Sequence, residues 1–233
     1  MTLYMKKNDT YILNIETATK NCSVSISKNG DLIALKEICE ANFSHAEKLH
    51  VFINDTLKEV NLKYENLNAI AVSKGPGSYT GLRIGVSSAK GLCFALDIPL
   101  ISVLTLESLA NAIKVDSGFI IPLLDARRQE VYTAIFDHNY IAIKKTFNYI
   151  LDENSFLDFL DLGKVTFLGD GAKKTSELIN HPNAIFLDNY FPSANEMVAL
   201  SYKKFRLNDF EDVAYFEPFY LKDFYVTVSK KKV

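Results

Sequence analysis

The most specific chemical signal in the sequence is a glycine-rich segment, KGPGSYTGLRIG, at residues 74–85. Backbone N–H groups at the start of a helix attract anions, so Lys74, Gly75 and Gly77 could approach a phosphate group. The segment differs from a P-loop because its lysine precedes the glycines, and Pro76 lacks a backbone donor. The small residues that follow suit the close approach of another helix or backbone. We favour this packing interpretation and keep phosphate binding as the alternative.

A charged turn, DARRQE at residues 125–130, separates two apolar segments. A hairpin held by its own salt bridges explains this turn, and the alternative is that Arg127 and Arg128 line a cleft. Further along, Gly169 and Gly171 frame a single aspartate and could bring backbone close to a nucleotide. Two isolated glycines are also typical of a plain turn, which is the interpretation that we favour.

Histidine and cysteine form no metal-binding pattern in the sequence. His45 and His50 are five residues apart, whereas two ligands on one helical face need a spacing of three or four. We predict that His45 is exposed or caps its helix. Cys22, Cys39 and Cys93 form no CxxC pair and lie beside apolar residues, which predicts buried, reduced thiols.

The composition favours a folded protein without a membrane span. The chain has 233 residues, 48% of them hydrophobic, which is enough for two lobes of roughly 100 residues each. The formal net charge of −2 lacks the basic footprint of a protein that binds nucleic acid unaided, apart from the lysines at residues 230–232. The apolar runs are too short to cross a bilayer, and the first residues lack a secretory signal. We therefore expect a cytoplasmic protein with no membrane contact.

The segments that position these groups alternate between strands and helices. Asn29-Gly30 between the second and third strands predicts a tight hairpin, because both positions tolerate positive φ. A helix follows, and the glycine-rich segment then connects a buried strand to a second helix. The predicted strands are residues 11–17, 22–28, 31–40, 68–73 and 99–103, and the helices begin near residues 44, 82 and 106.

The same order of elements begins again near residue 119, which indicates a duplication. Strands are expected at residues 119–125, 131–136, 140–147, 165–168 and 184–187, with helices from about residues 155, 172 and 193. We predict an α/β protein of two lobes, each a mixed sheet flanked by helices, with the natural ligand site in the cleft between them. The predicted boundaries are residues 1–116, 117–205, and 206–233 for a C-terminal segment with a basic tail.

Six motifs carry a family resemblance. They are IETATKNCSVSI from residue 15, SHAEKL from 44, KGPGSYTGLRIGVSSAKGL from 74, IPLISVLTLESLA from 98, LLDARRQEVYTAIF from 123 and GDGA from 169. Together they resemble the TsaB family, also called YeaZ. The resemblance implies a duplicated actin-like, ribonuclease H-like fold and a part in making threonylcarbamoyladenosine (t6A), the modification of the tRNA adenosine 3′ of the anticodon. In that family TsaB is an accessory protein, the related enzyme TsaD transfers the threonylcarbamoyl group, and the ATPase TsaE joins the complex.

Several positions differ from the active relative TsaD. Its two metal-binding histidines fall on Thr105 and Leu109, and neither side chain replaces imidazole as a transition-metal ligand. An acidic pair of its first hairpin becomes Lys20 and Asn21, and a Gly-Gly turn becomes Ala126, Arg127 and Arg128. The resemblance therefore implies no catalytic residue, no metal site and no cofactor on the isolated chain, with at most weak ATP or ADP binding in the complex.

The resemblance also implies that the first two helices carry the partner contact. They are expected to meet the same helices of a second copy, or of a TsaD-like transferase, in a four-helix contact. The chain alone would be a homodimer, a TsaE-like ATPase would join the complex, and tRNA would bind only through the complex. The expected interface residues, of which the sequence leaves open how many face the core instead, are Leu49, Phe52, Ile53, Thr56, Val60, Gly85, Ala89, Leu92 and Phe94. The alternative function is a nucleotide-dependent enzyme of the same fold, either a phosphotransferase or a glycoprotease-like peptidase.

Overall fold

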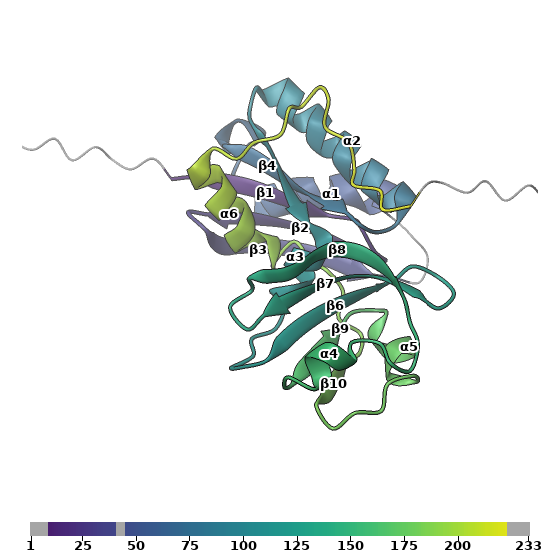
Figure 1. The fold of residues 1–233 in the computed structure, drawn as a ribbon. Helices are drawn as coiled ribbons and strands as arrows, with labels where there is room; N and C mark the ends of the chain where they lie inside the picture. The colour runs from purple at the N-terminus through teal and green to yellow at the C-terminus, as the bar shows by residue number, and fades with distance from the viewer. Residues whose placement is uncertain (1–8, 41–44, 223–233) are drawn as a thin grey trace, which may run out of the picture.

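The computed structural model describes residues 9–40 and 45–222, which form two five-stranded sheets with helices around them (Figure 1). The first sheet contains β1 (Tyr11–Glu16), β2 (Asn21–Lys28), β3 (Asp31–Cys39), β4 (Ala69–Gly75) and β5 (Leu100–Leu104). Its strand order is β3-β2-β1-β4-β5, with β1 antiparallel to β2 and parallel to β4. The predicted tight hairpin is confirmed, since Asn29 and Gly30 have φ values of 55° and 92°.

Two long helices, α1 (His45–Glu59) and α2 (Tyr79–Leu96), pack on one face of this sheet, and the short helix η1 (Tyr64–Asn66) lies between them in the sequence. Leu49 and Ile53 of α1 and Ala89 of α2 are fully buried in the same hydrophobic cluster as Leu13 and other sheet residues. The sheet and these helices form the first lobe.

The second sheet repeats the first one strand for strand. It contains β6 (Phe119–Asp125), β7 (Glu130–Asp137), β8 (Ala142–Ile150), β9 (Val165–Leu168) and β10 (Ala184–Leu187), in the order β10-β9-β6-β7-β8. β6 is antiparallel to β7 and parallel to β9, as β1 is to β2 and β4. The predicted duplication is confirmed by this pairing. In this second lobe, the helices α4 (Leu157–Leu160) and α5 (Ala172–Ser176) lie near the predicted positions and have only four and five residues.

The last helix of each repeat packs on the sheet of the other repeat. Leu106 and Leu109 of α3 (Thr105–Ala110) lie in one cluster with Leu124 and Phe136 of the second sheet. Met197 of α6 (Met197–Leu207) is buried on the face of the first sheet away from α1 and α2, with Ile12, Ala69, Ala71, Ile101 and Val103. The result is a duplicated actin-like, ribonuclease H-like α/β fold. The lobe boundaries at residues 116 and 205 stay predictions. α3 follows the first sheet in the sequence but packs on the second, and α6 follows the second sheet but packs on the first.

After α6 the chain turns back over the first lobe. Residues 209–222, which we call the strap, run along α2 and are drawn in yellow in Figure 1. Val213 and Phe216 of the strap pack against the first hydrophobic cluster. The predicted basic tail at residues 230–232 lies outside the described residues. Within the described ranges, no helix combines the length and the apolar character that a membrane crossing requires.

Two side chains lie where the sequence did not predict them. His45 is buried, and its Nε2 atom donates to the carbonyl of Thr19 at 2.7 Å, so it ties α1 to the turn after β1. Burial lowers the pKa of this imidazole. Cys39 is exposed because it ends the edge strand β3, whereas Cys22 and Cys93 are buried thiols as predicted.

Candidate functional site

The glycine-rich segment packs against the turn that follows β1. A Cβ atom on Gly77 would lie 2.3 Å from the carbonyl oxygen of Ala18, and one on Gly85 would lie 2.3 Å from Thr17 Oγ1. The N–H of Ser78 donates to the carbonyl of Ala18 at 2.6 Å. The chain itself therefore fills the space beside these glycines, which supports the packing interpretation.

Lys74 and Gly75 lie beneath the strap. The N–H of Phe219 donates to the carbonyl of Lys74 at 2.7 Å, and a Cβ atom on Gly75 would lie 2.7 Å from the carbonyl oxygen of Phe219. The ammonium of Lys74 lies 3.7 Å from a carboxylate oxygen of Glu211. These two residues therefore contact the strap, and a position near a nucleotide stays a prediction for them.

Three polar side chains converge at the carboxyl ends of β1 and β4 and the start of α3. Glu16 is fully buried, and its Oε1 atom accepts the N–H of Ala18 at 2.6 Å. Burial raises the pKa of this carboxyl to about 7, although the N–H of Ala18 acts in the opposite direction. The hydroxyls of Ser73 and Thr105 are 2.7 Å apart. Sequence reasoning missed Glu16; the signal was a carboxylate at the end of a mostly apolar strand.

The two positions that correspond to metal ligands in the active relative are core positions here. Thr105 is fully buried, and its hydroxyl is bonded to that of Ser73. Leu109 is equally buried, and its Cδ2 atom lies 3.0 Å from the place where Gly169 would carry a Cβ atom. Among the described residues, no three His, Cys, Asp or Glu side chains are grouped so that they could hold a metal ion. The two positions therefore carry the hydrogen-bonded hydroxyl of Thr105 and the alkyl side chain of Leu109.

Lys20 and Asn21 hold the segment that leads from β10 to α6. The Nδ2 atom of Asn21 donates to the carbonyl of Pro192 at 3.0 Å and to Glu37 Oε2 at 3.3 Å. The ammonium of Lys20 lies 4.3 Å from the centre of the Phe191 ring, which is a favourable cation–π distance. Lys20 and Asn21, which stand at the positions of the acidic pair, therefore make structural contacts with residues 191 and 192.

The charged turn connects β6 to β7 and exposes two arginines. Arg127 and Arg128 have φ values of 68° and 52°, in the left-handed region that non-glycine residues seldom adopt. The N–H of Arg127 donates to Asp125 Oδ1 at 2.7 Å. Both arginine side chains are exposed, and no ion pair joins either guanidinium to another described residue.

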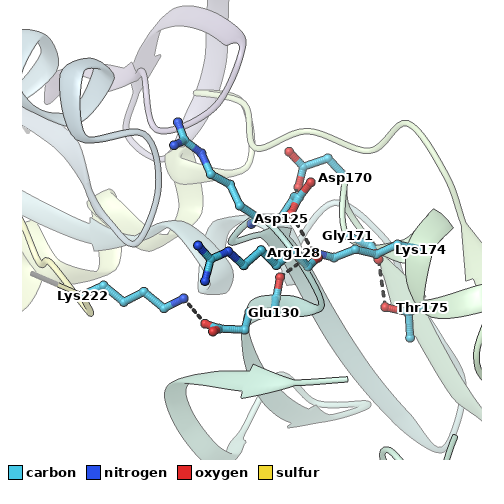
Figure 2. Close-up of polar contacts among 9 residues, drawn as sticks. Asp125, Arg128, Glu130, Asp170, Gly171, Lys174, Thr175 and Lys222 are labelled. Carbon is cyan, nitrogen blue, oxygen red and sulfur yellow. Dashed lines mark hydrogen bonds and ion pairs between the residues drawn. The ribbon is translucent and has the colours of Figure 1, made fainter. Parts of the chain in front are cut away.

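Lysines from outside the turn hold it in place (Figure 2). Lys174 donates to Asp125 Oδ1 at 2.6 Å and to the carbonyl of Arg128 at 3.1 Å. Lys222 of the strap pairs with Glu130. The interpretation of a hairpin held by its own salt bridges is therefore wrong, because the acidic residues of the turn pair with lysines from α5 and the strap. No sequence pattern pointed to Lys174.

The turn around Asp170 lies beside the charged turn. Asp170 Oδ1 accepts the N–H of Asp125 at 2.8 Å, and burial raises the pKa of the Asp170 carboxyl. A Cβ atom on Gly169 would lie 2.2 Å from the carbonyl oxygen of Leu123, and the N–H of Gly171 donates to the same oxygen at 3.0 Å. These contacts support the plain-turn interpretation and bring two of the predicted cleft segments together.

The expected interface residues on α1 and α2 fall into three groups by burial. The buried group faces the core of the chain itself and consists of Leu49, Ile53, Thr56, Gly85 and Ala89. Phe52, Val60 and Leu92 are partly buried against the same core, whereas the Phe94 side chain is 85% exposed. The buried group is therefore removed from the candidate partner surface. Helical periodicity alone could not separate these core-facing residues from the exposed ones.

An exposed ridge on α2 surrounds Phe94. Its other exposed members are Thr80, Arg83, Ser87, Gly91 and Ala95, which recur at helical spacing and are small except for Arg83. His50 of α1 joins α2 through a 3.3 Å hydrogen bond to Ser88 on the border of this ridge. Near Phe94 the ridge consists of the small residues Ser87, Gly91 and Ala95, so another helix can approach this end of α2 closely.

Comparison with known proteins gives a consistent family. The profile of the TsaD family, tRNA N6-adenosine threonylcarbamoyltransferase, matches residues 39–228. The tRNA threonylcarbamoyladenosine biosynthesis protein TsaB of Bacillus subtilis is 33% identical over 174 residues, which are 72% of this chain and 74% of that protein. TsaB of Escherichia coli is 29% identical over 220 residues, which are 91% of this chain and 94% of that protein.

Solved structures share the fold over nearly the whole chain. YeaZ from Pseudomonas aeruginosa superposes with a TM-score of 0.75 at 23% identity, covering 91% of this chain and all of that one. A second Pseudomonas aeruginosa protein, described as similar to peptidase YeaZ, gives a TM-score of 0.81 at 22% identity with the same coverage. The family profile and the Bacillus subtilis relative both cover more than two thirds of the sequence. This chain therefore belongs to the TsaB (YeaZ) family.

Proposed function

We propose that this chain is a non-catalytic accessory subunit for t6A modification of the tRNA adenosine 3′ of the anticodon. Family membership supports the pathway, because the related proteins are named for threonylcarbamoyladenosine biosynthesis. The observation that carries the accessory role is the state of the two metal-ligand positions. The hydroxyl of Thr105 is hydrogen-bonded to that of Ser73, and Leu109 is buried in the core.

The proposed mode of action is pairing with a TsaD-like transferase through the ridge on α2. Aromatic anchors carry much of the binding energy at protein interfaces, and Phe94 is the most exposed large hydrophobic side chain of the two candidate helices. Alone, the chain would use the same ridge to form a homodimer. A TsaE-like ATPase joins the complex in this proposal, and tRNA binds only through it.

In the proposed complex, the partner subunits and not this chain are the main ATP-binding proteins. Arg127 and Arg128 present two exposed guanidiniums beside the turn at Gly169 and Gly171, and could meet phosphate oxygens of ATP or ADP weakly. The isolated chain is therefore expected to bind Mg-ATP poorly and not to turn it over. Calorimetry with Mg-ATP tests this expectation, and micromolar binding with steady hydrolysis would favour the alternative of a phosphotransferase.

Reconstitution of t6A formation tests the proposal. The reaction contains tRNA, ATP, threonine, bicarbonate, a threonylcarbamoyl-adenylate synthase and TsaD-like and TsaE-like partners, with or without this chain. We expect t6A only when the chain is present. Equal t6A output without the chain, or t6A output from the chain without a transferase, contradicts the accessory role.

A matched pair of surface variants tests the ridge. Phe94→Asp is expected to weaken pairing with the transferase by about tenfold or more, because it puts a charge where an aromatic anchor is proposed. Leu162→Asp is the control, since Leu162 is 74% exposed in the second lobe, away from α2. Sedimentation velocity measures the pairing, and circular dichroism checks that both variants fold. Equal pairing of the two variants would remove Phe94 from the interface.

A further inference from the structure

The strap lies on the first lobe along most of its length. At its start, Glu211 forms a bridge with the edge strand β5, and its carboxylate accepts the hydroxyl of Ser102. Further along, Lys90 of α2 donates to the carbonyls of Ala214 at 3.1 Å and Phe216 at 2.9 Å. The strap thus covers part of an open sheet edge and then follows the helix.

The second half of the strap crosses the start of α2. The Tyr220 ring lies 4.9 Å from the Tyr79 ring, and the guanidinium of Arg83 lies 4.2 Å from the centre of the Tyr79 ring. Together with the backbone bond from Phe219 to Lys74, these contacts fix the direction in which the strap leaves α2.

The last described residue of the strap reaches the second lobe. Lys222 pairs with Glu130 at the start of β7, as Figure 2 shows, and its ammonium lies 5.8 Å from the centre of the Tyr132 ring on the same strand. The side chains of Lys222 and Glu130 are only 29% and 25% exposed, so solvent screens this pair less than a fully exposed one. The strap therefore touches both lobes.

We propose that the strap is a latch that restrains the angle between the two lobes, with the Lys222–Glu130 pair as its closing contact. Two covalent crossovers, through α3 and through the segment before α6, also join the lobes. Lobes joined in this way can rotate about their crossovers as a hinge. The strap adds a third connection that is non-covalent, and one partly exposed ion pair is weak enough to open reversibly.

Charge reversal of the latch in the full-length chain tests this proposal. One nitroxide is placed on Cys39, which is the exposed one of the three cysteines, and a second on Lys145→Cys in β8. Lys222→Glu or Glu130→Lys is expected to broaden the distance distribution between the labels and to raise amide exchange in residues 211–222 by about threefold. The combined exchange, Lys222→Glu with Glu130→Lys, is expected to restore both measurements.

Lys173→Glu is the control, because it reverses an exposed charge in the second lobe and this side chain has no ion pair in the described part of the chain. It should leave the label distances unchanged. The proposal is overturned if the single reversals leave the distances unchanged, even with faster exchange in the strap, or if the double variant does not restore them. The test uses the chain alone, so its result is independent of the proposed t6A role.

Discussion

Glu16 ends β1 with a fully buried carboxyl whose pKa is raised by burial from 4.5 to about 7. In the unfolded chain this group ionises near pH 4.5, whereas in the folded protein it stays protonated up to about pH 7. Its contribution to folding is therefore fully present below pH 4.5 and is lost as the pH rises through 7. Above that value, the folded protein holds a buried carboxylate at a cost.

Glu16→Gln is expected to remove this pH dependence. Between pH 5 and pH 8 the wild-type free energy of unfolding should fall relative to that of the variant by about 2 to 3 kcal/mol, since one pKa unit corresponds to about 1.4 kcal/mol. Urea unfolding followed by circular dichroism measures the difference. Glu65→Gln, at an exposed carboxyl, serves as the control and should parallel the wild type. Parallel curves for Glu16→Gln as well would show that burial does not shift this carboxyl.

Arg127 and Arg128 hold a backbone conformation that other residues adopt more easily. Arg127 and Arg128 have two consecutive positive φ values in the four-residue loop between β6 and β7, and Asn and Gly tolerate this left-handed region better than arginine. Arg127→Asn with Arg128→Gly should therefore raise the free energy of unfolding by about 1 kcal/mol and the melting temperature by a few degrees. Thermal unfolding measures this gain.

Arg127→Gln with Arg128→Gln is the matched control, because it removes both charges without improving the turn. We expect no stability gain from it, and a gain equal to that of Asn-Gly would mean that charge, and not backbone strain, limits the hairpin. Both variants lack the guanidiniums. Wild-type t6A output from both would remove these arginines from the proposed phosphate-proximal set.

Among the elements, α2 serves the core, the strap and the proposed partner on different faces. Gly85 faces the core, where a Cβ atom would lie 2.3 Å from Thr17 Oγ1, whereas nothing lies within 4 Å of a Cβ atom on Gly91. Gly91→Ala is expected to stabilise the isolated chain by up to about 1 kcal/mol through helix propensity, and Gly85→Ala to destabilise it. Thermal unfolding compares them.

The same Gly91→Ala variant is expected to bind the transferase less tightly, because the new methyl group stands on the ridge around Phe94. Sedimentation velocity with the partner measures this effect. Unchanged affinity in the stabilised variant would mean that the partner does not approach this part of α2 closely.

Strands and turns with clear local signals were predictable. The apolar pattern of β1, β2 and β4 and the Asn-Gly hairpin predicted the first sheet, and the repeated order predicted the second. The positions of the short helices were predicted but their lengths were not. Phe156, which precedes α4, has a φ of 64°, a conformation that no sequence pattern indicated. The exchange of α3 and α6 was not predictable either, because an apolar stripe shows that a helix is buried but not against which sheet.

The candidate site was predictable in part for similar reasons. Sequence motifs marked the glycine-rich segment and the charged turn, but not their neighbours. The strap binds α2 through the carbonyls of Ala214 and Phe216, which any sequence would offer. Lys174 is likewise one of many lysines until the fold brings α5 beside β6. The residue patterns located the two segments in the sequence. Their neighbours depend on the tertiary fold, which the patterns do not specify.

As a whole molecule, the two lobes share one strand order but differ in their helices. The first lobe keeps α1 and α2 with 15 and 18 residues, whereas α4 and α5 of the second lobe have four and five. The long helices give the first lobe an exposed ridge, and the second lobe has no helix of comparable length among the described residues. This asymmetry fits a duplicated fold in which one lobe serves a partner.

Titration of the t6A reaction with this chain tests the accessory role most directly. The transferase is held at a concentration well above its dissociation constant for the chain, and the rate of t6A formation is measured as the chain is added. A subunit that acts by pairing predicts a linear rise that breaks at one chain per transferase. A full rate at a few hundredths of an equivalent, as expected of a catalyst that turns over, would contradict the account.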